Sequence, residues 1–212
     1  AATPYSLYQN NEQYLHQLHC IGQGEYDLEQ IRIEDTPISS FEEIDYEIVQ
    51  PGDAVTLFDT DVVTAPEVAG QELLSTGDGG DWVGPFVANP AQTDCHQISV
   101  DIVMPRGVYY ANDSGGLNNR TITWQFEARQ IDDDGTAIGA WQTLGGETLT
   151  AATNTPQRMT FDYAVATGRY EVRALRTDAK DTSARAGHEL RWGGLKAVLD
   201  KTPDFGDITL IA

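Results

Sequence analysis

The sequence predicts a mainly β protein built around an antiparallel β-sandwich, and three observations lead to this fold class. Several short segments after residue 97 alternate apolar and polar side chains. Clusters of Gly, Asn and Asp separate these segments at short intervals. None of the segments shows the apolar period of an amphipathic helix. Strands that bury one side and expose the other, joined by tight turns, are typical of antiparallel sheets packed face to face.

Four segments carry the alternation most clearly, and each is expected to bury its apolar side. In the second segment Trp124 lies among the apolar positions, so we expect its indole in the core. About 110 residues with this organisation fit a sandwich of the immunoglobulin or fibronectin type III kind. The expected strands span residues 98–102, 122–129, 159–165 and 170–174. The expected turns span residues 112–116, 132–135, 145–146 and 167–168.

The first part of the chain carries weaker patterns, and we expect it to form part of a second, mixed domain. Residues 12–21 fit a helix and a strand equally well, because the window is too short to separate the two periods. Residues 31–33 alternate as a strand does. Residues 41–49 are expected to form another strand.

A change in composition marks a domain boundary between residues 75 and 90, where Ser, Gly, Asp and Pro favour turns. Residues 208–211 form an expected strand without an obvious partner in the sandwich. We therefore expect this strand to return to the first domain, which makes the sandwich an insertion. The expected division is a first-domain segment at residues 1–78, the inserted sandwich at 79–199 and the returning strand at 200–212.

The charge of the chain is strongly asymmetric. The net formal charge is −20, and residues 1–105 hold 19 acidic side chains against one basic one, Arg32, so 1 − 19 = −18. Residues 106–212 hold 14 acidic and 12 basic side chains, so 12 − 14 = −2. A surface this negative repels phosphate backbones and anionic lipids, so we expect no nucleic acid partner and no membrane insertion. The acidic surface is either a solvated face or one that docks on a basic neighbour.

The composition, 40% hydrophobic and 22% charged, is ordinary for a globular chain. No apolar run approaches the roughly 18 residues of a membrane helix, and the N-terminus lacks the regions of a signal peptide. The chain begins with Ala1, which we interpret as the start of an excised or processed fragment. Cys20 and Cys95 either form one disulfide or, as we expect, remain separate buried thiols in a reducing compartment.

No residue pattern matches a catalytic or metal site, so we expect no enzymatic activity, no cofactor and no bound metal. His16 and His19 have a spacing that a metal site on a helix uses, but no further ligand pattern supports them. Cys95 and His96 are neighbours that would point to opposite faces of a strand, which makes a poor nucleophile–base pair. The acidic run at residues 132–135 lacks the alternating ligands of a calcium loop and is interpreted as a hairpin turn.

Two of the four tryptophans are candidate binding aromatics. Trp82 lies in the expected linker and Trp141 lies beside turns, so both are better placed for exposure than Trp124. Exposed indoles form stacking platforms for sugars and contact points for proteins. The alternative is that both pack inside the protein, since an aromatic side chain buries a large area.

Short motifs spread over nearly the whole chain carry a family resemblance. They include Cys-Ile-Gly-Gln-Gly-Glu-Tyr-Asp at residues 20–27, Ile-Arg-Ile-Glu-Asp-Thr-Pro-Ile at 31–38 and Thr-Pro-Asp-Phe-Gly-Asp at 202–207. Further motifs lie at residues 11–15, 105–110, 156–158 and 168–173. Together they resemble the central part of phage tail tip attachment proteins, the host-specificity or J proteins of lambda-like long-tailed phages and prophages. The motifs are structural rather than catalytic.

The resemblance implies an assembly as well as a fold. Full-length members of this family are far longer than this chain and form a trimeric hub that closes the distal end of the tail tube, while their C-terminal parts contact the host receptor. The chain would then be a partial hub domain that carries the inserted sandwich. Its partners would be other tail-tip proteins, further domains of the same polypeptide and, in the full-length protein, two more copies. It would be made in the bacterial cytoplasm and reside in the virion.

We therefore expect a structural component of a phage or prophage tail tip that forms part of the distal hub and supports host adsorption. The alternative is a glycan- or protein-binding sandwich that decorates the tail and uses Trp82 or Trp141. A glycan hydrolase embedded in the tail is a third hypothesis, and the missing catalytic signature counts against it.

Overall fold

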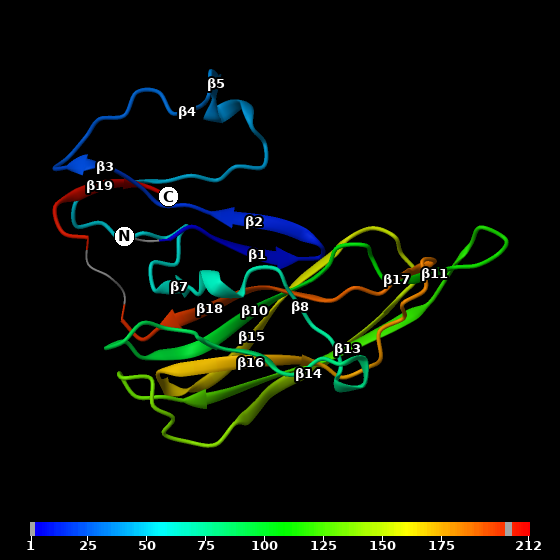
Figure 1. Cartoon of the computed structure of the whole chain (residues 1–212). Helices are drawn as coiled ribbons and strands as arrows, with labels where there is room; N and C mark the ends of the chain where they lie inside the picture. The colour runs from blue at the N-terminus through cyan, green and yellow to red at the C-terminus, as the bar shows by residue number, and fades with distance from the viewer. Residues whose placement is uncertain (1–2, 202–204) are drawn as a thin grey trace.

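The computed structural model describes residues 3–201 and 205–212. Two antiparallel sheets pack face to face into a sandwich, as Figure 1 shows, so the predicted fold class is confirmed. One sheet has the order β15 (Gln157–Gly168), β10 (Cys95–Met104), β18 (Arg191–Leu199), β7 (Val62–Thr64), with β8 (Gln71–Glu72) also paired to β18. The other has the order β14 (Gln142–Ala151), β13 (Arg120–Gln130), β16 (Tyr170–Arg176), β9 (Val83–Val87). We call them the five-stranded and the four-stranded sheet.

The core lies between these two sheets and follows the predicted alternation. Ile98 and Ile102 on β10 are fully buried, and Trp124 and Phe126 on β13 belong to the same apolar cluster. The rings of Phe126 and Trp192 meet edge to face with their centroids 5.3 Å apart. The prediction that Trp124 lies in the core is confirmed, since its side chain is 2% exposed.

The polar side of β10 is buried as well, which the alternation did not predict. Ser99 and Asp101 are 4% and 6% exposed, although the pattern placed them on a wet face. The hairpin of β1 (Tyr5–Gln9) and β2 (Glu12–His16) lies over this side of the five-stranded sheet (Figure 1). The five-stranded sheet is therefore covered on both faces.

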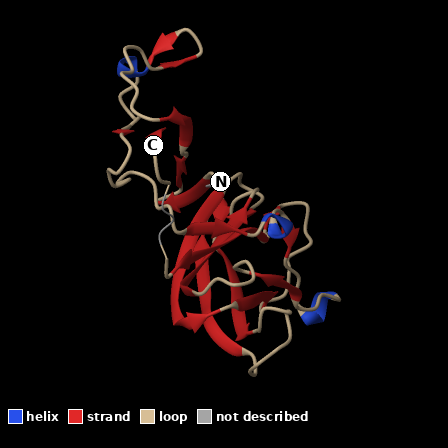
Figure 2. Ribbon diagram, turned by 90° about the vertical axis from the view of Figure 1, so that its left-hand side faces the viewer, coloured by secondary structure: helices blue, strands red, loops and turns tan. Residues whose placement is uncertain are grey.

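The other strands of the first part form a thin projection beside the sandwich (Figure 2). β19 (Ile208–Ile211) pairs with β3 (His19–Gln23) on one side and with β6 (Ile48–Val49) on the other. β4 (Arg32–Ile33) and β5 (Thr36–Pro37) form a small hairpin, followed by the 3-10 helix η1 (Ile38–Ser40). We call residues 12–57 together with β19 the N-terminal extension, which includes β2 of the hairpin as well as this projection.

Two ambiguous or wrong predictions fall in this extension. Residues 12–21, which fitted a helix and a strand equally well, belong to two strands. The strand predicted at residues 41–49 is wrong over most of its length, because only β6 is a strand. Its partner β19 ends at residue 211, and Glu47 and Ala212 exchange two backbone hydrogen bonds just beyond it. Upstream of Glu47 no partner strand continues the ladder in the part of the chain that the structure describes.

The sandwich sequence lies between strands that share one sheet, because β3 and β6 precede it and β19 follows it. β7 and β8 also precede residue 79, yet they join the five-stranded sheet by pairing with β18. The three-segment division at residues 78 and 199 stays a prediction.

Two of the four predicted turns, at residues 112–116 and 132–135, are present, one is wrong and one is displaced. Gly145 and Gly146 lie within β14, opposite Phe126 and Gln125, instead of forming a turn. A Cβ at Gly145 would collide with the ring of Tyr163, so the glycine there makes room for an aromatic side chain. The turn expected at residues 167–168 falls at residue 169, between β15 and β16.

Short elements complete the structure. At one end of the sandwich, β11 (Tyr109–Ala111) pairs with β12 (Leu117–Asn118) and β17 (Ala186–Gly187). Two more 3-10 helices are η2 (Pro66–Val68) and η3 (Thr76–Asp78).

In the described residues no helix is both long and apolar enough to span a membrane. Both cysteines are free, as expected; Cys95 is buried, but Cys20 is exposed because it lies on an edge strand of a small sheet.

Candidate interaction surface

The outer face of the four-stranded sheet carries a cluster of cross-strand ion pairs. The apolar residues of β13 face the core, so Glu127 and Arg129 face outward, and Glu171 and Arg173 do the same on β16. The register places Glu127 opposite Arg173 and Arg129 opposite Glu171. Arg173 donates from Nε and Nη2 to Glu127 Oε2 at 2.9 and 2.6 Å, and Arg129 donates to Glu171. Each charge on this face therefore has a cross-strand partner.

The two candidate tryptophans lie against this cluster of ion pairs. Trp82 lies just before β9 and Trp141 just before β14, and both are half-buried. The guanidinium carbon of Arg173 lies 4.2 Å from the ring centroid of Trp82 and 4.2 Å from that of Trp141. Arg129 lies 4.5 Å from the Trp141 centroid. The structure thus joins two residues that are far apart in the sequence into one aromatic–guanidinium cluster.

This cluster offers binding chemistry rather than bond-breaking chemistry. It presents the open parts of two indoles among planar guanidinium groups and paired carboxylates, a composition common at protein contact surfaces. A groove of about 270 Å³ lies beside it, lined by residues that include Gln130, Gln142 and Thr143. Binding by Trp82 and Trp141 stays a prediction.

Sequence reasoning singled out the tryptophans one by one and missed Arg173. A signal for it was present, because the alternation in residues 170–174 places Arg173 and Glu171 together on the outer side of the strand. The register that sets Glu127 opposite Arg173, however, depends on how β13 and β16 pair.

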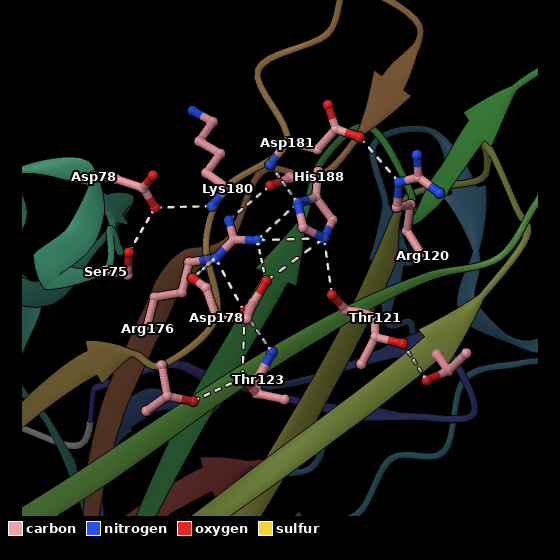
Figure 3. Close-up of polar contacts among 12 residues, drawn as sticks. Ser75, Asp78, Arg120, Thr121, Thr123, Arg176, Asp178, Lys180, Asp181 and His188 are labelled. Atoms are coloured by element: carbon pink, nitrogen blue, oxygen red, sulfur yellow. Dashed lines mark hydrogen bonds and ion pairs between the residues drawn. The ribbon is translucent and has the colours of Figure 1, made fainter.

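A buried polar network fixes one end of the sandwich, as Figure 3 shows. Arg176, at the end of β16, is 0% exposed. It donates to the backbone oxygen of His188 at 2.8 Å and to Asp178 Oδ2 at 2.8 Å. Asp178 Oδ1 also accepts a hydrogen bond from the backbone nitrogen of Thr123 at 2.7 Å. A buried guanidinium is tolerated only when its donors are satisfied, and this network satisfies them with groups from separate segments.

The contacts around His188 define its tautomer. Its Nδ1 accepts from the backbone nitrogen of Asp181 at 2.8 Å and lies 2.9 Å from Arg176 Nη2. Both of these groups are obligatory donors, so Nδ1 carries no proton. Nε2 lies 2.9 Å from the backbone oxygen of Thr121 and donates to it. His188 is therefore a neutral structural residue that joins β13 to the segment after β16.

Neighbouring contacts extend this network to the surface. Asp181 accepts from the backbone nitrogen of Ser183 at 2.9 Å and from Arg120 Nε at 3.0 Å. The Ser183 hydrogen bond and the Arg120 guanidinium hold the pKa of Asp181 below its usual range. Asp78 of η3 accepts from the backbone nitrogen of Lys180 at 2.8 Å, which ties the segment before β9 to the same end of the sandwich (Figure 3).

A second buried charge pair lies where the N-terminal hairpin contacts the sandwich. Lys196 on β18 donates to the two carboxylate oxygens of Asp101 at 2.7 and 2.6 Å and to the backbone oxygen of Ser6 at 2.9 Å. The side chains of Lys196 and Asp101 are only 4% and 9% exposed. Tyr8 of β1 donates from its backbone nitrogen to Thr160 Oγ1 at 2.9 Å. The hairpin therefore covers, and is held by, the polar face of the five-stranded sheet.

The remaining sequence candidates have structural contacts. His16 lies on β2 and stacks on Tyr5 with ring centroids 4.7 Å apart, whereas His19 lies on β3. Burial raises the pKa of Cys95 to about 12. Asp132 Oδ1 accepts from the backbone nitrogens of residues 134 and 136, so the hairpin-turn interpretation of residues 132–135 is confirmed. The described residues contain no cluster of three or more His, Cys, Asp or Glu suited to a metal ion.

Comparison with known proteins identifies the family. Residues 82–201, more than half of the chain, match the family model of the FNIII-A domain of tip attachment protein J. The comparison with curated proteins found no match. The family of this chain is therefore assigned from the match to the family model alone.

Solved viral structures show distant similarity. Infectious bursal disease virus Gx strain matches at 13% identity with a TM-score of 0.40, covering 78% of this chain and 36% of that chain. The receptor binding domain of spike protein P1 from bacteriophage PM2 matches at 11% identity with a TM-score of 0.31, covering 73% of this chain and 95% of that chain. The chain thus spans little more than a third of the bursal disease virus chain. From the family model over residues 82–201, the chain belongs to the family of the FNIII-A domain of tip attachment protein J and is a bacteriophage tail component.

Proposed function

We propose that this chain is a structural part of the distal hub of the tail tip and that it supports host adsorption. The observation that carries the proposal is the family match over a sandwich whose flanking strands, β3, β6 and β19, share a single sheet. A domain attached through both of its ends is restrained more strongly than one on a single linker. The proposed division is a hub segment at residues 1–78, the sandwich at 79–199 and a returning hub strand at 200–212.

The junction between these parts supports a rigid role. The hydrogen bonds from Lys196 to the backbone oxygen of Ser6 and from the backbone nitrogen of Tyr8 to Thr160 hold the β1–β2 hairpin against the five-stranded sheet. Such contacts favour one orientation of the hairpin on the sandwich. The chain would act through shape and packing, with other tail proteins and two further copies of the full-length protein as partners, and without catalysis.

Immunogold electron microscopy of induced phage particles tests the proposal, with an antibody raised against this chain. Gold confined to the distal tail tip is the expected result. Unlabelled particles, with the antigen only in the soluble lysate, would contradict it. Disrupted particles are labelled in parallel, so that an epitope buried in the assembled tip is still detected.

A second candidate function is glycan or protein binding by the sandwich. Its support is the cluster of Trp82, Trp141 and Arg173 beside a polar groove. Saturable binding of host surface glycans that Trp141→Ala or Trp82→Ala abolishes would favour it. The matched control is Trp124→Phe, which alters a core indole without touching the cluster. Equal binding by the wild type and both alanine variants would count against this function.

A further inference from the structure

Exposed apolar side chains gather in the N-terminal extension. Of the exposed large apolar residues in the described part of the chain, only Val87 and Ile138 lie outside it. The members in the extension are Tyr14, Leu15, Ile21, Tyr26, Ile33, Phe41, Tyr46, Ile48 and Leu57, with exposures between 38% and 58%. Clustered exposed apolar residues mark interaction sites more often than scattered ones do.

The shape of the extension explains this exposure. Apart from β2, which lies in the hairpin on the sandwich, its strands form small sheets that project from the sandwich (Figure 2) instead of packing into a second large core. A separate core beside it contains only Tyr5, Phe58 and Val62, with a few partly buried neighbours. The extension buries Val49 and Leu210 but is too thin to bury most of its large apolar residues.

The part of the sequence that contains these apolar residues is strongly acidic. Residues 12–57 contain 11 acidic side chains and one basic one, so the net charge is 1 − 11 = −10. Among the described residues none of these carboxylates forms an ion pair within the chain. An apolar surface with unpaired carboxylates is complementary to an apolar surface that carries lysine and arginine.

A second copy of the chain fits this requirement poorly. Eight of the 12 basic residues after residue 105 already pair with carboxylates in the described part of their own chain. Two of the eight, Arg176 and Lys196, are almost fully buried. The first half of a second copy would add only further negative charge.

We infer that the N-terminal extension docks on a different tail polypeptide, whose contact surface is apolar and carries lysine and arginine. This inference rests on the proposed function and deepens it by naming the chemistry of the partner. The exposed apolar residues supply the buried area of the contact. The carboxylates guide the approach and select the basic partner, so association weakens as salt rises.

Photo-cross-linking in intact phage particles tests this inference with the full-length protein. A photoreactive amino acid replaces Leu15, which is 58% exposed, and in a control particle it replaces Ile138, which is 67% exposed on the sandwich. The expected result is a cross-link from position 15 to a different tail polypeptide at a segment containing lysine or arginine. Position 138 is expected not to reach that segment.

Three outcomes would overturn the inference. They are a cross-link from position 15 only to the same protein, within its own chain or in another copy, a partner segment without basic residues, and no cross-link in particles that carry the chain. Gold labelling of the same particles separates the two proposals. Particles whose tips lack the chain would overturn the proposed function and the inference together, whereas labelled tips without the cross-link would overturn only the inference.

Discussion

The sandwich and the N-terminal extension both consist of antiparallel strands, yet they differ in the pairing of their charged residues and in the burial of their apolar residues. In the sandwich, charged residues pair across strands, as Glu127 does with Arg173, and apolar residues meet in one core. In the extension, the carboxylates form no ion pair with any residue that the structure describes, and large apolar side chains such as Leu15 remain exposed. The sandwich therefore buries its apolar residues and pairs many of its charges within the chain, whereas the extension leaves both exposed, as we propose for a contact surface.

The largest expected effect contrasts two aromatic side chains. Phe126→Ala removes a fully buried ring from the sandwich core and is expected to lower the free energy of unfolding by about 3–5 kcal/mol. Tyr46→Ala removes a ring that is 44% exposed in the extension, and a change within about 0.5 kcal/mol is expected. Urea unfolding of both variants measures the difference. Equal losses would break the contrast between the two regions.

The next effect concerns the junction between the regions. Lys196→Met leaves the Asp101 carboxylate buried without its cation, so a loss of about 3 kcal/mol in the free energy of unfolding is expected. The matched control is Arg185→Met, which breaks an exposed pair with Asp113 and should cost less than about 1 kcal/mol. Thermal unfolding compares the two. A cost for Lys196→Met no larger than the control's would show that the buried pair at the junction contributes no more than an exposed one.

A smaller effect distinguishes two buried hydroxyl groups of the sandwich. Tyr163 Oη is buried without a hydrogen-bond partner among the described residues, so Tyr163→Phe is expected to be neutral or to stabilise by up to about 1 kcal/mol. Tyr170 Oη donates to the backbone oxygen of Ala166 at 2.7 Å, so Tyr170→Phe should destabilise by about 1 kcal/mol. Denaturant unfolding should give changes in the free energy of unfolding of opposite sign for the two variants. Changes of equal sign would contradict the hydrogen bonding described for the two hydroxyl groups.

The smallest effect is a dependence on alkaline pH. Burial raises the pKa of Tyr163 to about 12, so the folded state retains a proton that the unfolded state releases from about pH 10. The contribution to stability is therefore present below that pH and is lost as the pH rises through the folded value. Wild type should lose more stability than Tyr163→Phe between about pH 10 and 11. If the free energy of unfolding fell equally with pH in the two proteins, the raised pKa of Tyr163 would be contradicted.

The sandwich was largely predictable because its strands obey a local rule. Alternating residues such as Ile98 and Phe126 indicate which side of each strand is buried, whatever the partner strand is. The same rule failed for Asp101 and for Gly145. Asp101 is buried by a hairpin from the other end of the sequence, and Gly145 is required by the ring of Tyr163 on another strand. Both outcomes depend on contacts that are distant in sequence.

The candidate site was predictable only in part for the same reason. Trp82 and Trp141 were identified from composition and the position of turns. Their meeting over Arg173 depends on the pairing of β13 with β16 and on where the chain enters β9 and β14. The buried Arg176–His188 network carried no signal, because a buried arginine in a strand cannot be told from an exposed one by alternation alone.

Hydrogen–deuterium exchange, measured on the isolated chain and on the full-length protein in phage particles, shows which surface is covered in the tail. We expect slow exchange in β10 and β13 in both states, and fast exchange of residues 12–57 that slows strongly only in the particle. Unchanged exchange in residues 12–57, with new protection on the outer face of the four-stranded sheet instead, would contradict this expectation. That result would move the contact surface from the extension to the cluster around Trp82 and Trp141.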